Sequence, residues 1–186
     1  QRPSERIDAG RASARRAAAA TRGGRRRGRR VHRHERRLSA AMVDIPIVQL
    51  DPDLPLPAYA HAGDAGLDLR SRIDVVIPPA GGRVLVPTGV AIAIPEGHAG
   101  WVLPRSGLAL THGIALANAP GLIDAAYRGE LKVIMLNTDP HEPFEVRRGD
   151  RIAQLVIQQF ATVQWQPVDA LDGNDRGGGF GHSGRA

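Results

Sequence analysis

Residues 83–97 read RVLVPTGVAIAIPEG, and this stretch decides the fold class. It contains two short runs rich in β-branched and aliphatic residues, Arg83 to Pro87 and Val90 to Ile94, followed by the turn-forming sequence Pro95-Glu96-Gly97. Runs of this length that are bounded by Pro and Gly are typical of strands joined by tight turns. The stretch therefore predicts two strands and no helix.

The same pattern recurs from Ile45 onward, at a spacing typical of an all-β sandwich or barrel. The fourteen Pro of the chain argue against a helix-rich fold, and only residues 107–111 resemble a short helix. We expect an all-β, jelly-roll-like β-barrel whose core is built from Val, Ile, Leu and Ala, because aromatic residues make up only 4% of the chain. The other predicted strands are Ile45 to Leu50, Val75 to Ile77, Gly100 to Leu103, Leu131 to Leu136, Phe144 to Val146, Ile152 to Phe160 and Val163 to Val168.

Length and composition limit the class of protein. A chain of 186 residues is long enough for one domain with a single core. Cys is absent, which excludes disulfides and thiolate zinc sites and agrees with a reducing cytoplasm. No uncharged run approaches the roughly 18 residues of a membrane span. We expect a soluble, cytoplasmic protein with no membrane partner.

The positive charge is confined to one end of the chain. The chain has a net charge of +6, but residues 1–41 hold 14 Arg against Glu5, Asp8 and Glu35, which leaves a net −5 on the remainder. Nucleic-acid binding needs clustered cations that displace the counterions of phosphates, and the acidic remainder lacks them. We therefore expect no stable nucleic-acid partner.

The chain divides into three expected segments. Residues 1–41 have too few large apolar residues to order themselves, and they are a basic disordered arm, an organelle-targeting peptide or upstream sequence that is not normally translated. We favour the last reading because Met42 directly precedes the first predicted strand. Residues 42–171 are the β domain. Residues 172–186 form a Gly-rich tail that is either a flexible terminus or an arm that closes over a phosphorylated ligand.

Two segments carry polar groups suited to a nucleotide. In residues 104–109, PRSGLA, Ser106 is placed to cap a helical turn whose N–H groups face an anion together with Arg105, although an ordinary cap beside a surface Arg has the same sequence. Residues 118–130, NAPGLIDAAYRGE, place polar groups across two turns, and loops of this content usually hold function. In them, Asp124 is either a structural turn carboxylate or a functional one, and Tyr127 either packs or stacks on a ligand. Arg128 and Glu130 are candidates for a structural ion pair.

Two further polar side chains interrupt apolar runs. Gln154 lies in the strand that begins at Arg151, and Asp68 lies between Leu67 and Leu69. A buried amide or carboxylate is costly unless it is paired or hydrogen-bonded. We therefore expect both to have partners, which for Gln154 include a bound ligand.

These segments together resemble the five motifs of the trimeric dUTP pyrophosphatase (dUTPase) family, in the same order and at similar spacing. The resemblance spans about Ile45 to Gly184, and the chain departs from the family pattern at Ala126 and at His182. The matching segments are residues 65–69, 104–109, 121–130, 151–155 and 176–184.

The resemblance implies hydrolysis of dUTP to dUMP and pyrophosphate by attack of water on the α-phosphorus, which limits uracil in DNA and supplies dUMP for dTMP synthesis. It also implies an obligate homotrimer with active sites shared between subunits. Asp124 would be the catalytic residue that activates the water, and Mg²⁺ would assist, with Asp68 as an indirect ligand through water. The residues implied to bind the substrate are Arg105, Ser106, Gly107, Asn118, Gly121, Leu122, Ile123, Tyr127, Lys132, Gln154, Arg176, Phe180 and Ser183.

Two rival functions remain. A dCTP deaminase has the same architecture, but it needs a Glu about ten residues beyond Asp124, where this chain has Ile134. A nucleic-acid-binding module would use the basic segment 1–41 and would lose its activity when that segment is deleted. The order and spacing of the five segments favour the hydrolase over both.

Overall fold

The structure, a computed structural model, describes residues 42–173. The basic segment 1–41 and residues 174–186 lie outside the described residues. Of the three expected segments, the structure therefore describes the β domain and the first two residues of the Gly-rich arm, Asp172 and Gly173. The described residues belong to one compact unit.

The sequence RVLVPTGVAI forms one ten-residue strand, β4 (Arg83–Ile92), instead of the two predicted strands. Its register against β8 (Glu130–Asn137) shifts between Pro87 and Ala91, a β-bulge or similar irregularity that is called the bulge of β4 below. Gly89 in this bulge has φ +77°, a conformation that favours glycine. The Thr88-Gly89 pair is thus a bend within one strand.

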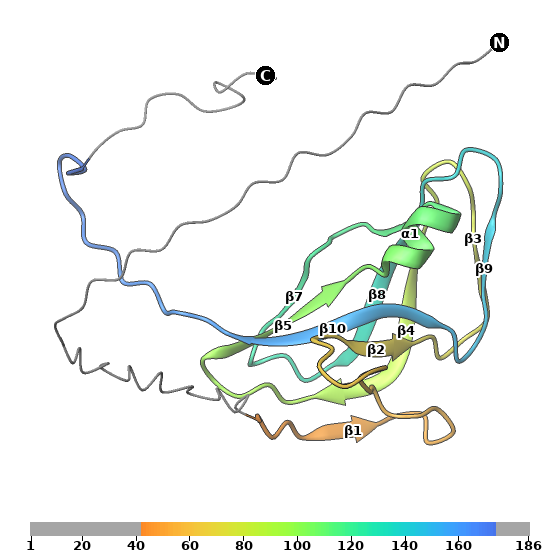
Figure 1. Ribbon diagram of the computed structural model, residues 1–186, viewed down its shortest axis with the longest axis horizontal. Coiled ribbons are helices and arrows are strands. Elements are labelled where there is room, and N and C mark those ends of the chain that lie inside the picture. The colour runs from red at the N-terminus through yellow and green to blue at the C-terminus, as the bar shows by residue number, and fades with distance from the viewer. Residues whose placement is uncertain (1–41, 174–186) are drawn as a thin grey trace, which may run out of the picture. The chain divides into compact units, whose positions relative to one another are not determined.

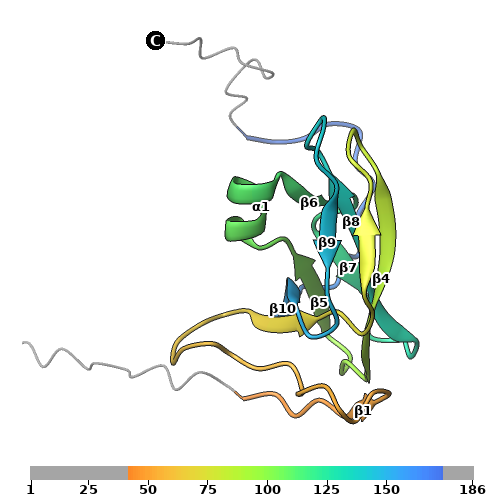
Figure 2. The same ribbon diagram turned by 90° about the vertical axis from the view of Figure 1, so that its right-hand side faces the viewer.

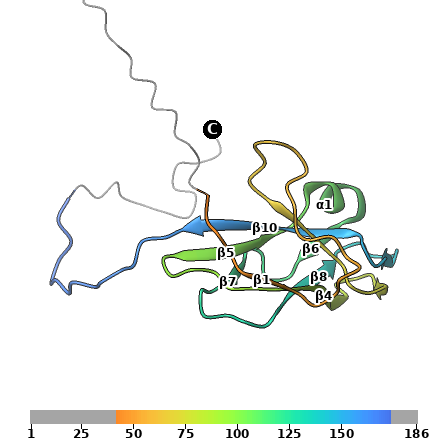
Figure 3. The ribbon, with the colours of Figure 1, turned by 90° about the horizontal axis from the view of Figure 1, so that it is seen from below.

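Two four-stranded sheets and a two-stranded ribbon, all antiparallel, make up the described fold (Figure 1). The first sheet has the order β1 (Ile47–Gln49), β4, β8, β6 (Ile114–Leu116), and the second has the order β2 (Leu67–Arg70), β10 (Arg151–Gln159), β5 (His98–Leu103), β7 (Gly121–Ile123). The ribbon pairs β3 (Val75–Ile77) with β9 (Phe144–Val146). Figure 3 shows the layer with β5 and β10 above the layer with β4 and β8. The expected jelly-roll-like all-β class is confirmed.

The two sheets enclose an aliphatic core. Leu69, Val86, Val133, Met135 and Ile152 are at most 2% exposed, and they come from strands of both sheets. No aromatic side chain is among the buried core residues of the described domain. Because burial of each such side chain stabilises the fold by about 1.5–3 kcal/mol, the packed sheets fix the positions of the strand ends that carry the candidate site.

Several strand predictions need correction. β2, β6 and β7 were not predicted, because three or four residues between Gly, Pro and polar residues carry little periodicity. The predicted strand Val163 to Val168 is wrong, since this segment pairs with no strand of the described chain. An extended segment becomes a strand only where a partner satisfies its backbone, and Pro167 has no N–H to donate. Trp165 in this segment is 86% exposed.

The described residues contain one helix, α1 (Ser106–His112), which extends the predicted helix by one residue at each end. It ends at Gly113, which has φ 62° and donates its N–H to the carbonyl of Ala109. The ring of His112 lies 5.0 Å from that of Phe144, which places α1 beside β9 (Figure 2). Within residues 42–173, α1 is too short to qualify as a membrane-crossing helix, and no other helix is present.

Asn137 joins β8 to the two neighbouring loops. Its side chain is fully buried, its Nδ2 donates to the carbonyls of Ile77 and Glu142, and its Oδ1 accepts from the N–H of Asp139. Asp139 in turn accepts from the backbone N–H groups of Glu142 and His141, which lowers the pKa of its carboxyl below the ordinary value. A polar group buried without partners is costly, so these bonds hold the chain together at this corner.

We predict that Asn137→Leu lowers the free energy of unfolding by about 2–4 kcal/mol, because it removes the partner of the buried carbonyl of Ile77, of the part-buried carbonyl of Glu142 and of the N–H of Asp139. Urea unfolding at a fixed protein concentration measures the change. Gln159→Leu, which removes an exposed amide from β10, serves as the control and should change stability by less than about 0.5 kcal/mol. Equal urea midpoints for Asn137→Leu and the wild type would contradict this role of Asn137.

Candidate active site

Strand β10 brings three of the candidate segments together. Gln154 of β10 pairs with Asp68 of β2 on one side and with Leu103 of β5 on the other. Residues directly opposite one another in antiparallel strands lie on the same face of the sheet, so Asp68 and Gln154 share a face at the end of β5 that leads into Arg105. A Cβ at Gly66 would lie 3.1 Å from the Cβ of Gln154, so glycine at this position lets the chain pass close to Gln154.

Asp68 is a buried carboxylate that lies between two guanidinium groups. Its side chain is 9% exposed, with Nε of Arg105 3.4 Å from Oδ1 and Nη1 of Arg151 3.1 Å from Oδ2. Arg105 also donates from Nη1 to the backbone carbonyl of Arg151 at 3.0 Å. The prediction that Asp68 needs partners is confirmed, and the two partners are cations. Asp68 in turn orients Arg105.

One oxygen of this carboxylate has spare hydrogen-bonding capacity. Oδ1 of Asp68 is buried, and it accepts no hydrogen bond from the described residues. Its ion pair with Arg105, at 3.4 Å, lacks the geometry of a hydrogen bond. Oδ1 is therefore free to accept a hydrogen bond from a water molecule.

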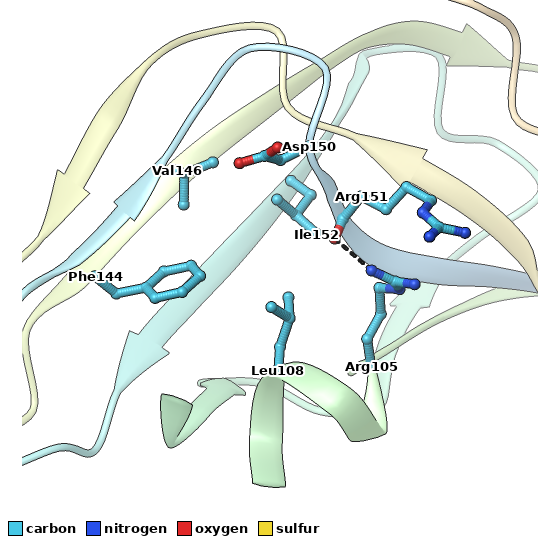
Figure 4. Close-up of a pocket in the computed structure, with 7 residues that line it drawn as sticks. All are labelled: Arg105, Leu108, Phe144, Val146, Asp150, Arg151 and Ile152. Carbon is cyan, nitrogen blue, oxygen red and sulfur yellow. Dashed lines mark hydrogen bonds between the residues drawn. The ribbon is translucent and has the colours of Figure 1, made fainter. Parts of the chain in front are cut away.

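A pocket of about 290 Å³ adjoins the two guanidinium groups (Figure 4). Arg105 and Arg151 form its cationic end, where the dashed line in Figure 4 joins Arg105 to the carbonyl of Arg151. The rest of the wall is mainly apolar. Its other lining residues are Leu108, Phe144, Val146, Asp150 and Ile152.

The start of α1 differs from the sequence prediction. Arg105 is the N-cap residue, with extended backbone angles of φ −95° and ψ 125°, and its carbonyl accepts from Ala109 N–H. Ser106 is therefore the first helical residue, and the prediction that it caps the turn is wrong, because the cap position is already taken by Arg105. Ser106 and Gly107 are exposed, and a Cβ at Gly107 would meet no atom within 4 Å. There is thus open space for a ligand beside these two residues.

The second candidate segment folds as β7 followed by a loop. Gly121 pairs with Val102 of β5, and a Cβ at Gly121 would lie 3.2 Å from Nδ2 of Asn118. Glycine at position 121 therefore allows Asn118 to fold back against β7. Leu122 is 52% exposed and Ile123 is half-buried.

The side chains of Asp124 and Lys132 are both exposed. Asp124 directly follows β7, and Lys132 lies opposite Pro87 on β8. Neither side chain makes a hydrogen bond or an ion pair within the described chain. Both are therefore available to a ligand.

Tyr127 is held by its own loop. Its hydroxyl donates to the carbonyl of Glu130 at 2.9 Å, and a Cβ at Gly129 would lie 2.6 Å from that hydroxyl oxygen. Arg128 donates to the carbonyls of Ala125 and Tyr127. The interpretation of Arg128 and Glu130 as an ion pair is wrong, because the Glu130 carboxylate instead meets Arg72 and the N–H of Gly89 at the bulge of β4.

The strand register separates Asp124 from Arg105 and Gln154 along one chain. Arg105 follows the end of β5 that pairs with Gln154, whereas Asp124 follows Ile123, which pairs with Gly100 three residues back along β5. At about 3.4 Å per residue, Asp124 lies on the order of 10 Å or more from the group formed by Arg105 and Gln154. Arg176, Phe180, His182 and Ser183 lie outside the described residues.

Sequence reasoning missed the contributions of Arg151 and Arg72. Arg151 was noted only as the first residue of its motif, although the need of Asp68 for a cationic partner was a usable signal. Arg72 lies two residues beyond β2, and nothing in its sequence context indicated a contact with Glu130, which is 58 residues away. Pairings over such separations depend on strand register, which only the structure reveals.

Comparisons of the sequence with a family model and with curated proteins both find dUTPases. The dUTPase family model matches residues 53–184. A deoxyuridine 5'-triphosphate nucleotidohydrolase of Thermobifida fusca is 57% identical over 143 residues, which cover 76% of this chain and 79% of the relative. The enzyme of the same name from Streptomyces coelicolor is 53% identical over 148 residues, which cover 79% of this chain and 80% of the relative.

Solved structures of phage dUTPases are also similar. A mutant dUTPase of Staphylococcus bacteriophage 80alpha, solved with dUpNHpp, has a TM-score of 0.69 and 26% identity, covering 77% of this chain and 99% of the phage chain. A mutant dUTPase of phage phi11 of S. aureus, described as revealing the coordination of a structural Mg(II) ion, has a TM-score of 0.64 and 25% identity, covering 69% and 98%. The chain belongs to the dUTPase family.

Proposed function

We propose that the protein hydrolyses dUTP to dUMP and pyrophosphate, with water attacking the α-phosphorus. The observation that carries this proposal is the group formed by Asp68 of β2, Gln154 of β10 and Arg105 at the start of α1, in a chain that matches the dUTPase family over residues 53–184. An oriented guanidinium beside open space suits a triphosphate, which needs charge-assisted donors.

The phosphate chain is assigned to the start of α1 and to β10. Arg105 is pre-oriented by Asp68 and by the carbonyl of Arg151, which reduces the freedom it loses when it binds phosphate. Ser106 and Gly107 add a hydroxyl and backbone N–H groups beside open space, and Gln154 adds its amide from the adjacent strand. The arm of residues 172–186 would bring Arg176 and Ser183 to the terminal phosphate, with His182 beside them.

The nucleoside is assigned to β7 and the loop that follows it. Asn118 offers both a donor and an acceptor to the uracil edge, and the backbone of Gly121, Leu122 and Ile123 completes the pocket. Tyr127 lies beneath the sugar and excludes a 2′-hydroxyl, while Phe180 stacks on the base. Lys132, exposed at the start of β8, is a further contact.

Asp124 is assigned as the group that orients and activates the attacking water. Its carboxylate is exposed and makes no hydrogen bond within the described chain, so it is free to accept a proton from water. The proton moves from the water to the Asp124 carboxylate as the new oxygen–phosphorus bond forms. Pyrophosphate leaves with the electron pair of the broken bond. No side-chain nucleophile takes part.

Magnesium fits this site as an ion held mainly by the substrate. The residues that the structure describes contain no group of three His, Cys, Asp or Glu that would form a protein cage. The buried Oδ1 of Asp68 has spare accepting capacity, which suits a water in the shell of the ion. When bound, Mg²⁺ neutralises charge on the pyrophosphate leaving group.

The site is proposed to be shared between the subunits of a homotrimer. Asp124 and Arg105 lie on the order of 10 Å or more apart along one chain, and this separation supports a site that takes the two residues from different subunits. The extended segment after β10 also exposes large apolar side chains, with Val163 64% and Trp165 86% exposed, as expected of a segment that packs on a neighbour. The cytoplasm is the proposed location, in agreement with the absence of Cys.

The dCTP deaminase alternative lacks its acid–base group. A deaminase would need a Glu at the position of Ile134. Ile134 lies in β8, where it is half-buried and opposite Leu85 of β4. An aliphatic side chain at this position cannot transfer a proton to the pyrimidine.

The experiment that tests the function compares four substrates. Purified protein is incubated with dUTP, dTTP, UTP and dCTP, and the release of pyrophosphate and ammonia is measured. We expect pyrophosphate from dUTP, little from the other three, and no ammonia from dCTP. Asp124→Asn should lower kcat by at least about a hundredfold without changing Tm, because the side chain is exposed. No release from dUTP, or full activity of Asp124→Asn, would reject the function or the mechanism, respectively.

Mixed trimers test whether the site is shared. Arg105→Ala and Asp124→Asn chains, each inactive alone, are unfolded together at equal concentration and refolded. If the two residues of a site come from different subunits, random assembly leaves about a quarter of the sites intact, so about a quarter of the wild-type activity returns. If both residues come from one chain, every site keeps a defect and no activity returns, which would reject the shared site.

A further inference from the structure

The loop that carries Tyr127 is a small, internally bonded unit. The N–H of Tyr127 donates to the carbonyl of Asp124 at 3.0 Å, and its hydroxyl donates to the carbonyl of Glu130 at 2.9 Å. Arg128 closes the loop by donating to two of its carbonyls. Among the described residues, these bonds all lie within residues 124–130. The loop is therefore braced internally, and it joins the rest of the domain at its two ends.

The bulge of β4 holds the second end of the loop. Oε1 of Glu130 accepts from the N–H of Gly89 at 2.9 Å, and the carbonyl of Leu131 accepts from the hydroxyl of Thr88 at 2.7 Å. Thr88 is only 4% exposed, so its hydrogen bond is protected from water. The bulge makes the contact of Gly89 possible, because regular pairing would leave no extra residue to turn its N–H toward a side chain.

Arg72 supplies the charge opposite Glu130. Its Nη1 lies 3.5 Å from Oε1 of Glu130, and its Nε lies 3.7 Å from Oδ2 of Asp51. Asp51 is itself paired with Arg148 at 2.8 Å. These four alternating charges connect segments that are far apart in the sequence, and the two carboxylates are only 16% and 12% exposed. The network therefore ties the end of the Tyr127 loop to the body of the domain.

We propose that Thr88 and Arg72 are positioning residues that hold Tyr127 where it discriminates deoxyribose from ribose. This inference rests on the proposed function. Both residues act on Tyr127 through the first residues of β8, because Thr88 donates to the carbonyl of Leu131 and Arg72 faces the carboxylate of Glu130. Since the Tyr127 hydroxyl is bonded to the Glu130 carbonyl, a shift of Glu130 moves the ring. Exclusion of one hydroxyl group depends on close fit, so a small displacement admits a 2′-hydroxyl.

Four variants test the proposal. Thr88→Val removes the hydroxyl at nearly constant volume, and Thr88→Ser restores it. Arg72→Met removes the charge opposite Glu130 from a side chain that is 38% exposed, so this variant is expected to fold. Arg147→Met is the matched control, because the only ion pair of Arg147 within residues 42–173 is with the exposed Glu145 on the β3–β9 ribbon.

Two measurements are made on each full-length variant. The first is the ratio of kcat/KM for dUTP to kcat/KM for UTP. The second is the rate of amide hydrogen exchange in residues 124–130 without substrate. We expect Thr88→Val to lower the ratio by about tenfold and Arg72→Met by about threefold, with faster exchange in both. Thr88→Ser and Arg147→Met should retain the wild-type ratio and exchange rates.

Clear results would overturn the proposal. A folded Thr88→Val with an unchanged ratio would do so, as would a Thr88→Ser variant that loses as much discrimination as Thr88→Val. If Thr88→Val does not fold, the Arg72→Met variant decides the outcome. The proposal is then rejected if this variant keeps the wild-type ratio of kcat/KM for dUTP to UTP and the wild-type rate of amide exchange in residues 124–130. If the wild-type protein does not hydrolyse dUTP, the proposed function fails instead, and the exchange rates still test whether the bulge holds the loop.

Discussion

The buried carboxylate of Asp68 is the constraint on which the arrangement of the candidate site depends. A charged side chain that is 9% exposed needs compensation, and Arg105 and Arg151 provide it from the start of α1 and the start of β10. The ion pairs thus fix three chain segments around one point. They also orient Arg105 before any ligand arrives. The same carboxylate keeps Oδ1 free to accept a hydrogen bond from water. Asp68 thus both holds the two Arg side chains in place and offers an acceptor to a bound water.

A second connection, at the bulge of β4, holds the end of the loop that carries Tyr127. Thr88 and Gly89 donate to Leu131 and to the Glu130 side chain, and the loop that carries Tyr127 ends there. Strand β4 therefore has two tasks. Its Val and Ile side chains fill the core, and its irregular centre positions a loop. Core packing and the anchoring of this loop are in this way built into neighbouring residues of one strand.

Much of this could be predicted from the sequence, and the remainder could not for physical reasons. Short β-branched runs predicted β3 and β9 at their observed bounds and the all-β class. The need of a buried Asp68 for partners also followed from its neighbours in the sequence. In contrast, the Glu130–Arg72 contact depends on strand register over 58 residues, and the N-cap at Arg105 depends on the backbone angles at the end of β5. Val163 to Val168 has the composition of a strand but no partner edge in the described chain.

The central claim is that water, directed by Asp124, attacks the α-phosphorus of dUTP. Hydrolysis in water labelled with oxygen-18, followed by mass spectrometry of both products, tests it most directly. The account predicts one labelled oxygen in dUMP and none in pyrophosphate, because the new bond forms on the α-phosphorus and the bridging oxygen leaves with pyrophosphate. Label in pyrophosphate with unlabelled dUMP would place the attack on the β-phosphorus and contradict the account.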